Sequence, residues 1–465
     1  MSARSGRSLR CLALALVALS SWATIVGADS SRTSVESPDS IAFRNGLWFD
    51  GAGFRPATFY SVGGILRRAR PATVAQTIDL RGLYVVPAFG EAHNHNVEGE
   101  WNVDAVIRRY LQDGVFYVKI PGQIPEFSNR IKDRLNRPDS IDVAFSNGGF
   151  TGPGGHPIAL YRDVLREHRY LPVAGALSPE WFDNRAYYIV DSRADLLAQW
   201  RRLVASRPDF VKVYLVCSEF FGQTHTPCRG RRGLDPTLLP DIVSLAHSAG
   251  RTVSAHVETA TDFRIALEVG VDEITHIPGW FLVDAAMAPR ARLSEVDARL
   301  VAERGVPVIT TTVASRAMGP MRTEPGEPQD HHQFGAHGHA ASHDQGEGAG
   351  RPEIERAERE VQVANLRLLR RHGAKILIGA DHADTSLPEA LNLLGMGIFS
   401  NLELLRMWAE TTPRAIFPAR RLGRLDEGFE ASFLALEGNP LDDFTRVQRI
   451  RLRVKAGRLL HISDR

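Results

Sequence analysis

Two histidines, His93 and His95, are the first residues in the sequence whose spacing could hold a metal ion. They follow an apolar, β-branched run in the stretch YVVPAFGEAHNHNV, which begins at Tyr84. Because strand side chains alternate between two faces, both imidazoles are expected on one face, where they could bind a metal. The spacing alone is weak evidence, since a second such pair, His337 and His339, lies in a loop-like region.

Four later residues could complete a metal site, and each stands at the end of a predicted strand: Lys212, His256, His276 and Asp381. Taken singly they have ordinary explanations, because a lone strand histidine is usually a core residue and an aspartate often caps a turn. In a parallel barrel, however, the carboxyl ends of the strands meet at one mouth. The six side chains together therefore predict a metal centre.

Strand-like and helix-like segments alternate through the middle of the chain, which is typical of parallel βα units. The predicted strands cover residues 84–93, 115–120, 141–146, 210–215, 252–256, 273–276, 306–312 and 375–381. The predicted helices cover residues 103–112, 194–206, 236–248, 261–268, 294–304 and 353–371. The fold class is therefore α/β, and eight strands favour a closed (β/α)8 TIM-type barrel. An open dinucleotide-binding sheet lacks support, because no G-x-G-x-x-G follows an early strand.

Both ends of the chain are rich in short β-like segments separated by turns, at residues 41–78 and again over the last forty or so residues. Neither end could cover a sheet by itself. Together they predict a small β-sandwich domain formed from both termini. The predicted organisation is a signal peptide at 1–28, a barrel at 87–420, and a β-domain composed of 29–86 and 421–465.

The first residues have the composition of a secretory signal peptide. A basic start, an apolar core at 11–19 and a small-residue exit at 26–28 predict cleavage near Ala28. A membrane anchor is the alternative, but the apolar core is short for a span. The protein is therefore expected to be exported, periplasmic or secreted, without stable membrane insertion after cleavage. Export leaves Cys217 and Cys228 in an oxidising compartment, where a disulfide is favoured over two free thiols.

The composition is that of an ordinary soluble globular protein, with 43% hydrophobic and 24% charged residues. The formal net charge is +2, and removal of the basic leader would bring it close to zero. Nucleic acid and acidic membranes are therefore not expected partners, whereas a small-molecule substrate is. The sequence leaves the oligomeric state open.

Lys212 needs a separate explanation, because an ammonium group has no lone pair and is costly to bury. Reaction of its amine with carbon dioxide would give a carbamate, whose two oxygens can bridge two divalent metals. The alternative is an ordinary lysine paired with Asp381 or another carboxylate.

Five stretches resemble the metal-ligand strands of the amidohydrolase superfamily: VVPAFGEAHNH, DFVKVYL, VSAHVE, ITHIPG and ILIGAD. The resemblance is greatest to exported members with a carboxylated lysine, related to Xaa-Pro dipeptidase-like and imidazolonepropionase-like proteins. It covers nearly the whole chain, because WAETTPRAIF, GRLDEGFEASFLALEGNPL and RVKAGRLL resemble the last helix and the returning β-domain of that family. The stretch NGGFTGPGGHP is similar to a substrate-side loop and brings His156 to the mouth.

The resemblance implies a cofactor of two divalent metal ions, with zinc as the expected element. The ligands it implies are His93, His95 and Asp381 for the more buried ion, His256 and His276 for the other, and Lys212 as the bridge.

Three positions depart from the family pattern. Gly90 and Glu91 stand where the family usually has Ile-Asp, and His382 follows the aspartate; both changes are expected to alter the pocket. The stretch FEASFLAL lacks the usual Ala-Asp, which concerns only the β-domain.

The predicted mechanism follows once two metals are granted, because metal ions activate water and polarise carbonyl groups. Asp381 is then placed to take the proton of the nucleophile and to pass it to the leaving nitrogen. Tyr214 and Glu258 each lie two residues beyond a ligand on the same strand, so both are expected at the mouth. Tyr214 would orient the substrate and Glu258 a ligand or an amine, unless either simply packs. His156 and His382 are the other predicted substrate contacts.

The leading prediction is a metal-dependent hydrolase of amide-type carbon–nitrogen bonds, with a dipeptide or an N-acyl amino acid as substrate. One alternative is a mononuclear cyclic amide hydrolase or deaminase, which would not need the bridging lysine. The other is a non-catalytic exported metal-binding protein that uses the insertion at 314–352, which contains His331, His332, His337, His339 and His343. That insertion could equally be a solvated loop.

Overall fold

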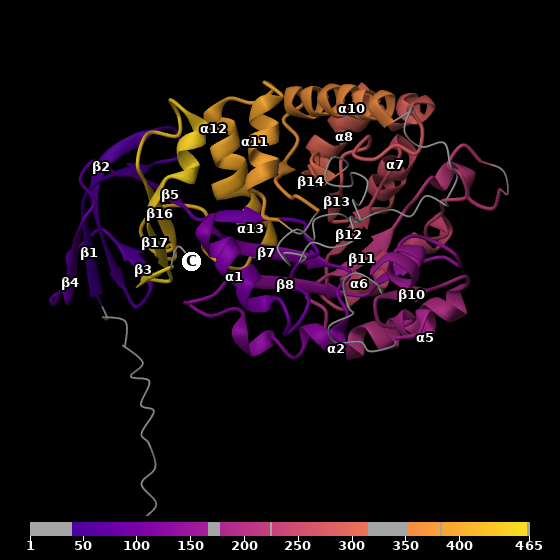
Figure 1. The fold of residues 1–465 in the computed structure, drawn as a ribbon, viewed down its shortest axis with the longest axis horizontal. Coiled ribbons are helices and arrows are strands. Elements are labelled where there is room, and N and C mark those ends of the chain that lie inside the picture. The colour runs from indigo at the N-terminus through magenta and orange to yellow at the C-terminus, as the bar shows by residue number, and fades with distance from the viewer. Residues whose placement is uncertain (1–39, 166–176, 224–225, 315–350, 382–383, 463–465) are drawn as a thin grey trace, which may run out of the picture. The chain divides into compact units, whose positions relative to one another are not determined.

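The computed structural model describes residues 40–165, 177–223, 226–314, 351–381 and 384–462. The predicted signal peptide at 1–28, the five histidines of the 314–352 insertion and His382 lie outside the described residues. The described strands fall into one sheet built from both ends of the chain and two parallel sheets (Figure 1).

The end sheet has eight strands. Its N-terminal strands are β1 (Ser40–Phe49), β2 (Phe54–Val62), β3 (Ile65–Arg67), β4 (Gln76–Asp79) and β5 (Tyr84–Pro87). Its C-terminal strands are β16 (Phe433–Leu436), β17 (Ile450–Lys455) and β18 (Arg458–Leu459). β5 and β16 join the two groups as antiparallel neighbours, with Val86 opposite Leu434. The predicted association of the two ends is therefore seen, and their closure into a sandwich stays a prediction.

Aromatic side chains explain why these distant segments pair. Trp48 of β1 packs against Phe59 of β2 and Phe433 of β16, with ring centroids 4.5 and 5.1 Å apart. Phe43 meets the same Phe433 ring edge to face at 4.9 Å. All four rings are buried, so these contacts bury apolar area from both ends of the chain in one core.

The remaining strands are parallel. One sheet contains β6 (Phe89–Glu91), β7 (Val115–Pro121) and β8 (Asp142–Asn147). The other has the order β10 (Tyr187–Ile189), β9 (Gly149–Thr151), β11 (Val211–Tyr214), β12 (Val253–His256), β13 (Glu273–Thr275), β14 (Val308–Ile309) and β15 (Ile376–Leu377). The predicted α/β class with parallel strands is confirmed, and β9 and β10 are additions to the predicted set.

Backbone hydrogen bonds connect the segments that follow β6 and β15. Ala92 N donates to Ile378 O at 2.9 Å, and Ala380 N donates to His93 O at 3.1 Å. The first strand of one parallel sheet is therefore tied to the last strand of the other just before the predicted ligands. Closure of the two sheets into one barrel stays a prediction.

The predicted single strand at 84–93 is wrong, because the segment divides at Ala88. Its first part is β5 of the end sheet, and its second part is β6 of a parallel sheet. Phe89 N donates to Gly114 O at 2.9 Å, so the chain passes from one sheet to the other within a few residues. Both parts are apolar and buried, which is why hydrophobic pattern alone did not separate them.

Helices alternate with the parallel strands as predicted, with their ends shifted by a few residues. They are α1 (Val103–Gln112), α5 (Arg193–Ala205), α6 (Leu239–Ser248), α7 (Ala260–Val269), α8 (Glu295–Arg304) and α10 (Arg351–Arg371). Capping boxes begin α7, through Thr259 and Asp262, and α8, through Ser294 and Asp297. No helix in the described part of the chain combines the length and the hydrophobicity that a membrane span requires.

A last helical segment follows β15 and packs on the strands that lead to the site. It contains α11 (Leu387–Gly395), α12 (Asn401–Arg406), the π-helical turn η7 (Met407–Thr411) and α13 (Thr412–Ile416). Trp408 stacks on Phe89 of β6 at 3.8 Å, and Ile378 N donates to Thr412 Oγ1 at 3.0 Å. The segment therefore packs against the two stretches of chain that lead to His93 and to Asp381.

Candidate functional site

The predicted site residues that the structure describes come together around one small cavity of about 30 Å³. They are His93, His95, His156, Lys212, Tyr214, His256, His276 and Asp381. Lys212 is the second residue of β11, His256 ends β12 and His276 directly follows β13, so three neighbouring parallel strands supply them. Residues separated by almost three hundred positions along the chain are thus placed side by side.

Asp381 is the centre of the densest part of the site. Its Oδ1 lies 2.9 Å from Nε2 of His93 and 3.1 Å from Nε2 of His95. Its Oδ2 lies 3.8 Å from Nδ1 of His276. One ligand atom from each of His93, His276 and Asp381 lies within 4.8 Å of the others, which is an arrangement that could hold a metal ion.

The protonation states also suit metal binding. Burial holds the pKa of His93 and of His276 well below the ordinary histidine value, so both imidazoles are neutral and keep a lone pair. Burial alone would raise the pKa of Asp381, but the adjacent His93 and His276 hold it well below the ordinary value. The site therefore presents neutral nitrogen ligands and an ionised carboxylate at neutral pH.

His256 contacts Glu258, which is in turn paired with Arg231. Its Nε2 lies 3.4 Å from Oε1 of Glu258, and the Arg231 guanidinium forks onto both oxygens of the same carboxylate. Burial would raise the pKa of Glu258, but Arg231 and His256 lower it to about 2. Glu258 was expected at the mouth; it is 5% exposed and orients a histidine instead of lining the cavity.

A disulfide holds the loop that carries Arg231. Cys217 and Cys228 are bonded, with their Cα atoms 6.6 Å apart, as the sequence predicted. Arg231 N donates to Cys228 O at 2.9 Å, directly after the bridge. The covalent link therefore fixes the loop close to the point where Arg231 reaches Glu258.

Lys212 is buried, with 1% of its surface exposed. Among the described residues its Nζ has no hydrogen-bond partner, so the alternative of a lysine paired with a carboxylate is not formed. Burial lowers its pKa to about 7, partly opposed by Asp381 and Glu273. A large fraction of the amine is therefore neutral near pH 7, which is the form that reacts with carbon dioxide.

Several residues of the site were missed by sequence reasoning. Trp280 lines the cavity and stacks on His276 with ring centroids 4.1 Å apart; its position in ITHIPGW, four residues after that histidine, is the only signal. Tyr161 also lines the cavity. Thr311 follows β14 and lies 2.8 Å from Nδ1 of His276 through its hydroxyl.

Glu91, one of the departures from the family pattern, lies beneath the site. Its Oε1 accepts hydrogen bonds from His93 N at 3.2 Å and Ala380 N at 2.9 Å. It is fully buried, and burial raises its pKa well above the ordinary value. Glu91 does not line the cavity. Glu91 therefore acts on the pocket indirectly, through hydrogen bonds to the two segments that carry His93 and Asp381.

Three residues at the ends of consecutive strands adopt the left-handed backbone conformation. They are His276, Thr311 and Asp381, with φ of 73°, 50° and 55°. This region is uncommon for residues other than glycine and is strained for a β-branched threonine. Such strain persists where the surrounding structure imposes it, which is typical of functional sites.

Comparison with known proteins gives a match in structure only. No protein-family model and no curated protein matches the sequence. A solved amidohydrolase matches 92% of this chain and 100% of its own, with 20% identity and a TM-score of 0.66. The chain has the amidohydrolase fold. The resemblance predicted from the five strand motifs is confirmed at this level.

Two further structures share the amidohydrolase fold of the chain. A prolidase complexed with N-methylphosphonate-L-proline matches 90% of this chain and 99% of its own, with 18% identity and a TM-score of 0.64. A Xaa-Pro dipeptidase with methionine bound in the active site matches 91% and 100%, with 16% identity and a TM-score of 0.65.

Proposed function

We propose that the protein is a metal-dependent hydrolase of amide-type carbon–nitrogen bonds, with dipeptides or N-acyl amino acids as its substrates. The observation that carries the proposal is the gathering of four histidines, Lys212 and Asp381 around one buried cavity. Neutral buried imidazoles beside an ionised carboxylate form a donor set that zinc prefers. The prolidase and the Xaa-Pro dipeptidase of the same fold support the choice of dipeptides.

We propose that the site holds two ions. His93, His95 and Asp381 would hold one, and His256 and His276 the other. Lys212 would bridge them after its neutral nitrogen forms a bond to the carbon of carbon dioxide and releases a proton, which gives a carbamate. When bound, the ions would lower the pKa of a coordinated water and polarise the substrate carbonyl.

Asp381 is the proposed catalytic base. Its carboxylate is ionised at neutral pH, so it can accept the proton of the attacking water and then deliver it to the leaving nitrogen. His156 and Tyr214 line the same cavity with ring centroids 5.4 Å apart, and we assign them to the polar groups of the substrate. His382, which follows the base in the sequence, completes the proposed substrate contacts.

The proposal also covers the barrel fold and the cellular compartment of the enzyme. The parallel strands would close into a (β/α)8 barrel, which would bring the strand ends into a single mouth. Residues 1–28 would be removed on export, and the mature chain would act outside the cytoplasm on a small-molecule substrate. The disulfide between Cys217 and Cys228 supports an oxidising compartment.

A mononuclear cyclic amide hydrolase or deaminase is the second candidate. It is favoured by one observation, because ligand atoms of His93, His276 and Asp381 lie within 4.8 Å of one another and could hold a single ion. Elemental analysis together with a mass measurement separates the two candidates. Two zinc ions per chain together with a mass increase of one carbon dioxide on Lys212 support the first, and one ion with unmodified Lys212 supports the second.

The function is tested by screening the zinc-loaded chain, residues 29–465, against dipeptides and N-acyl amino acids for amine release. We expect Asp381→Asn to keep the melting temperature of the wild type within a few degrees and to reduce kcat by roughly 10²- to 10⁴-fold. Asp241→Asn is the matched control, because Asp241 pairs with Arg193 on the surface. Wild-type turnover in Asp381→Asn would remove Asp381 from the mechanism.

A further inference from the structure

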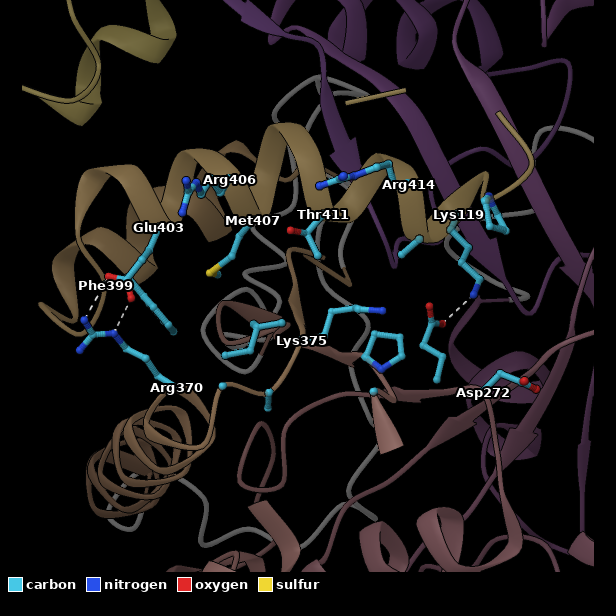
Figure 2. A pocket seen from close by; sticks show the side chains of 18 of the residues that line it. Lys119, Asp272, Arg370, Lys375, Phe399, Glu403, Arg406, Met407, Thr411 and Arg414 are labelled. Carbon is cyan, nitrogen blue, oxygen red and sulfur yellow. Dashed lines mark hydrogen bonds and ion pairs between the residues drawn. The ribbon is translucent and has the colours of Figure 1, made fainter. Parts of the chain in front are cut away.

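A second, larger cavity of about 880 Å³ lies at the opposite end of the parallel strands. Thr252, Glu273, Pro307 and Lys375 line it, and these residues precede or begin β12, β13, β14 and β15. The other wall is the helical segment from α12 to α13, which crosses the upper part of Figure 2. Among the described residues none lines both this cavity and the metal site. The two spaces are therefore separate.

Several charges in this cavity are already matched. Lys119 Nζ lies 2.7 Å from Glu273 Oε1, and Arg370 Nε lies 2.7 Å from Glu403 Oε1. Figure 2 shows the pair of Arg370 and Glu403 on its left and Lys119 on its right. Asp272 accepts a 2.7 Å hydrogen bond from the first backbone N–H of β12. The acidic side chains that line the cavity are therefore already engaged.

Three cations that line the cavity have no acidic partner among the other described residues that line it: Lys375, Arg406 and Arg414. Within the described ranges Lys375 forms no ion pair and no side-chain hydrogen bond. Arg406 donates its Nε to the carbonyl of Gly51. Arg414 donates its Nε to the carbonyl of Glu410 at 2.9 Å and forms a long ion pair of 3.8 Å with the carboxylate of the same residue, which does not line the cavity. Figure 2 shows the two arginines on the helical wall and Lys375 on the opposite wall. The cavity thus has an excess of positive charge on both sides.

The wall between the cations is apolar. Met407 lies on the helical segment between the two arginines in Figure 2, and Phe399 and Ile376 line the cavity nearby. All three side chains are largely buried, with 9%, 7% and 4% of their surface exposed. A ligand that combined one negative charge with an apolar group would satisfy both parts of the lining.

We propose that this cavity binds a small organic anion, a carboxylate attached to an apolar ring or chain. The carboxylate would lie between Lys375 and the arginines, because guanidinium and ammonium groups bind carboxylates through charge-assisted hydrogen bonds. The apolar group would lie against Met407 and Phe399. A volume of about 880 Å³ is within the range of small-molecule sites, roughly 300–1,000 Å³.

Calorimetric titration of the full mature chain with phenylacetate, phenylacetamide and acetate tests the proposal. Phenylacetate is expected to bind, phenylacetamide at least about tenfold more weakly because it lacks the charge, and acetate also more weakly because it lacks the ring. Chelator-treated protein is expected to bind phenylacetate equally well, which separates this cavity from the metal site.

Lys375→Met locates the ligand. The substitution is expected to weaken phenylacetate binding about tenfold, which is the loss of one charge-assisted hydrogen bond, and Lys375→Glu is expected to weaken it further. Lys132→Met removes an exposed lysine that does not line the cavity and is the matched control. Melting temperatures without ligand show whether each variant is folded. Equal binding of the acid and the amide, or unchanged binding in folded Lys375→Met, would overturn the proposal.

Discussion

The two ends of the parallel strands use charged side chains in different ways. At the carboxyl ends, titratable groups crowd a cavity of about 30 Å³, and Lys212 has no hydrogen-bond partner there among the described residues. At the amino ends, a cavity of about 880 Å³ is bordered by matched pairs such as Lys119 with Glu273. Unmatched burial changes pKa values and prepares groups for chemistry, whereas matched pairs mainly hold structure. The larger cavity is therefore not the one that we propose for catalysis.

The strongest test of this contrast is Lys212→Met. We expect kcat for the amide substrate to fall by roughly 10³-fold, because without the proposed carbamate the proposed metal centre would lose several kcal/mol of transition-state stabilisation. The metal-free variant should also melt at a higher temperature than the metal-free wild type, because a buried group without a partner is removed. Activity assays and thermal unfolding check both. A variant that lost stability and kept its activity would assign Lys212 a structural role.

Lys119→Met tests the opposite end. It leaves the buried Glu273 carboxylate without its cation, so the free energy of unfolding is expected to fall by roughly 3–5 kcal/mol. Lys119→Met combined with Glu273→Gln should recover part of that loss. The kcat of the folded protein should change less than tenfold in both variants. Denaturant titration and steady-state kinetics measure the two effects, and a large loss of kcat at unchanged stability would contradict the contrast between the ends.

Arg231→Gln sharpens the comparison within the carboxyl end, where we propose the catalytic site. The substitution leaves Glu258 without the guanidinium that holds it beside His256, and zinc affinity is expected to fall by about 10- to 100-fold. Arg229→Gln is the control on the same loop, because the exposed Arg229 pairs at 2.7 Å with Asp284. Competition with a coloured chelator measures both affinities. Equal affinities in the two variants would show that Arg231 does not position His256.

The smallest expected effect is a pH dependence of the metal-free protein. The pKa of Lys212 is about 7 in the folded state against 10.5 in a free lysine, so between these values the unfolded chain binds more protons. Stability should therefore rise with pH from about 7 to 10.5, by at most about 1.4 kcal/mol per pH unit from this group. Urea unfolding at pH 7.5 and 9 measures the rise. Lys212→Met should lack this contribution, and an identical slope in both proteins would contradict the assignment.

Features that depend on local sequence could be predicted. Capping residues mark the helix starts at Thr259 and Ser294. His93 and His95 meet as their spacing predicted, although both lie beyond the end of β6 and not on a strand. The disulfide was predicted from Cys217 and Cys228, the two cysteines that would remain after the predicted removal of the leader. The candidate site was therefore largely predictable from residues at the ends of predicted strands.

Features that depend on distant partners could not be predicted. Glu258 meets Arg231 across a loop, so its place behind His256 has no local signal. Trp280 is one of many aromatic residues in the chain, and only the turn after β13 brings it onto His276. The division of 84–93 between two sheets is invisible because both parts are apolar. The amino-end cavity joins cations from separate segments, none of which has a distinctive motif.

The left-handed residues at three consecutive strand ends have a consequence for adaptation. Each such conformation costs roughly 1–3 kcal/mol, and the surrounding fold must supply that energy. A lineage selected only for heat tolerance would be expected to replace Thr311 by glycine or asparagine, which accept φ near 50° more readily. The threonine hydroxyl beside His276 would be lost with it. Selection for thermal stability and selection for turnover would therefore favour different residues at position 311.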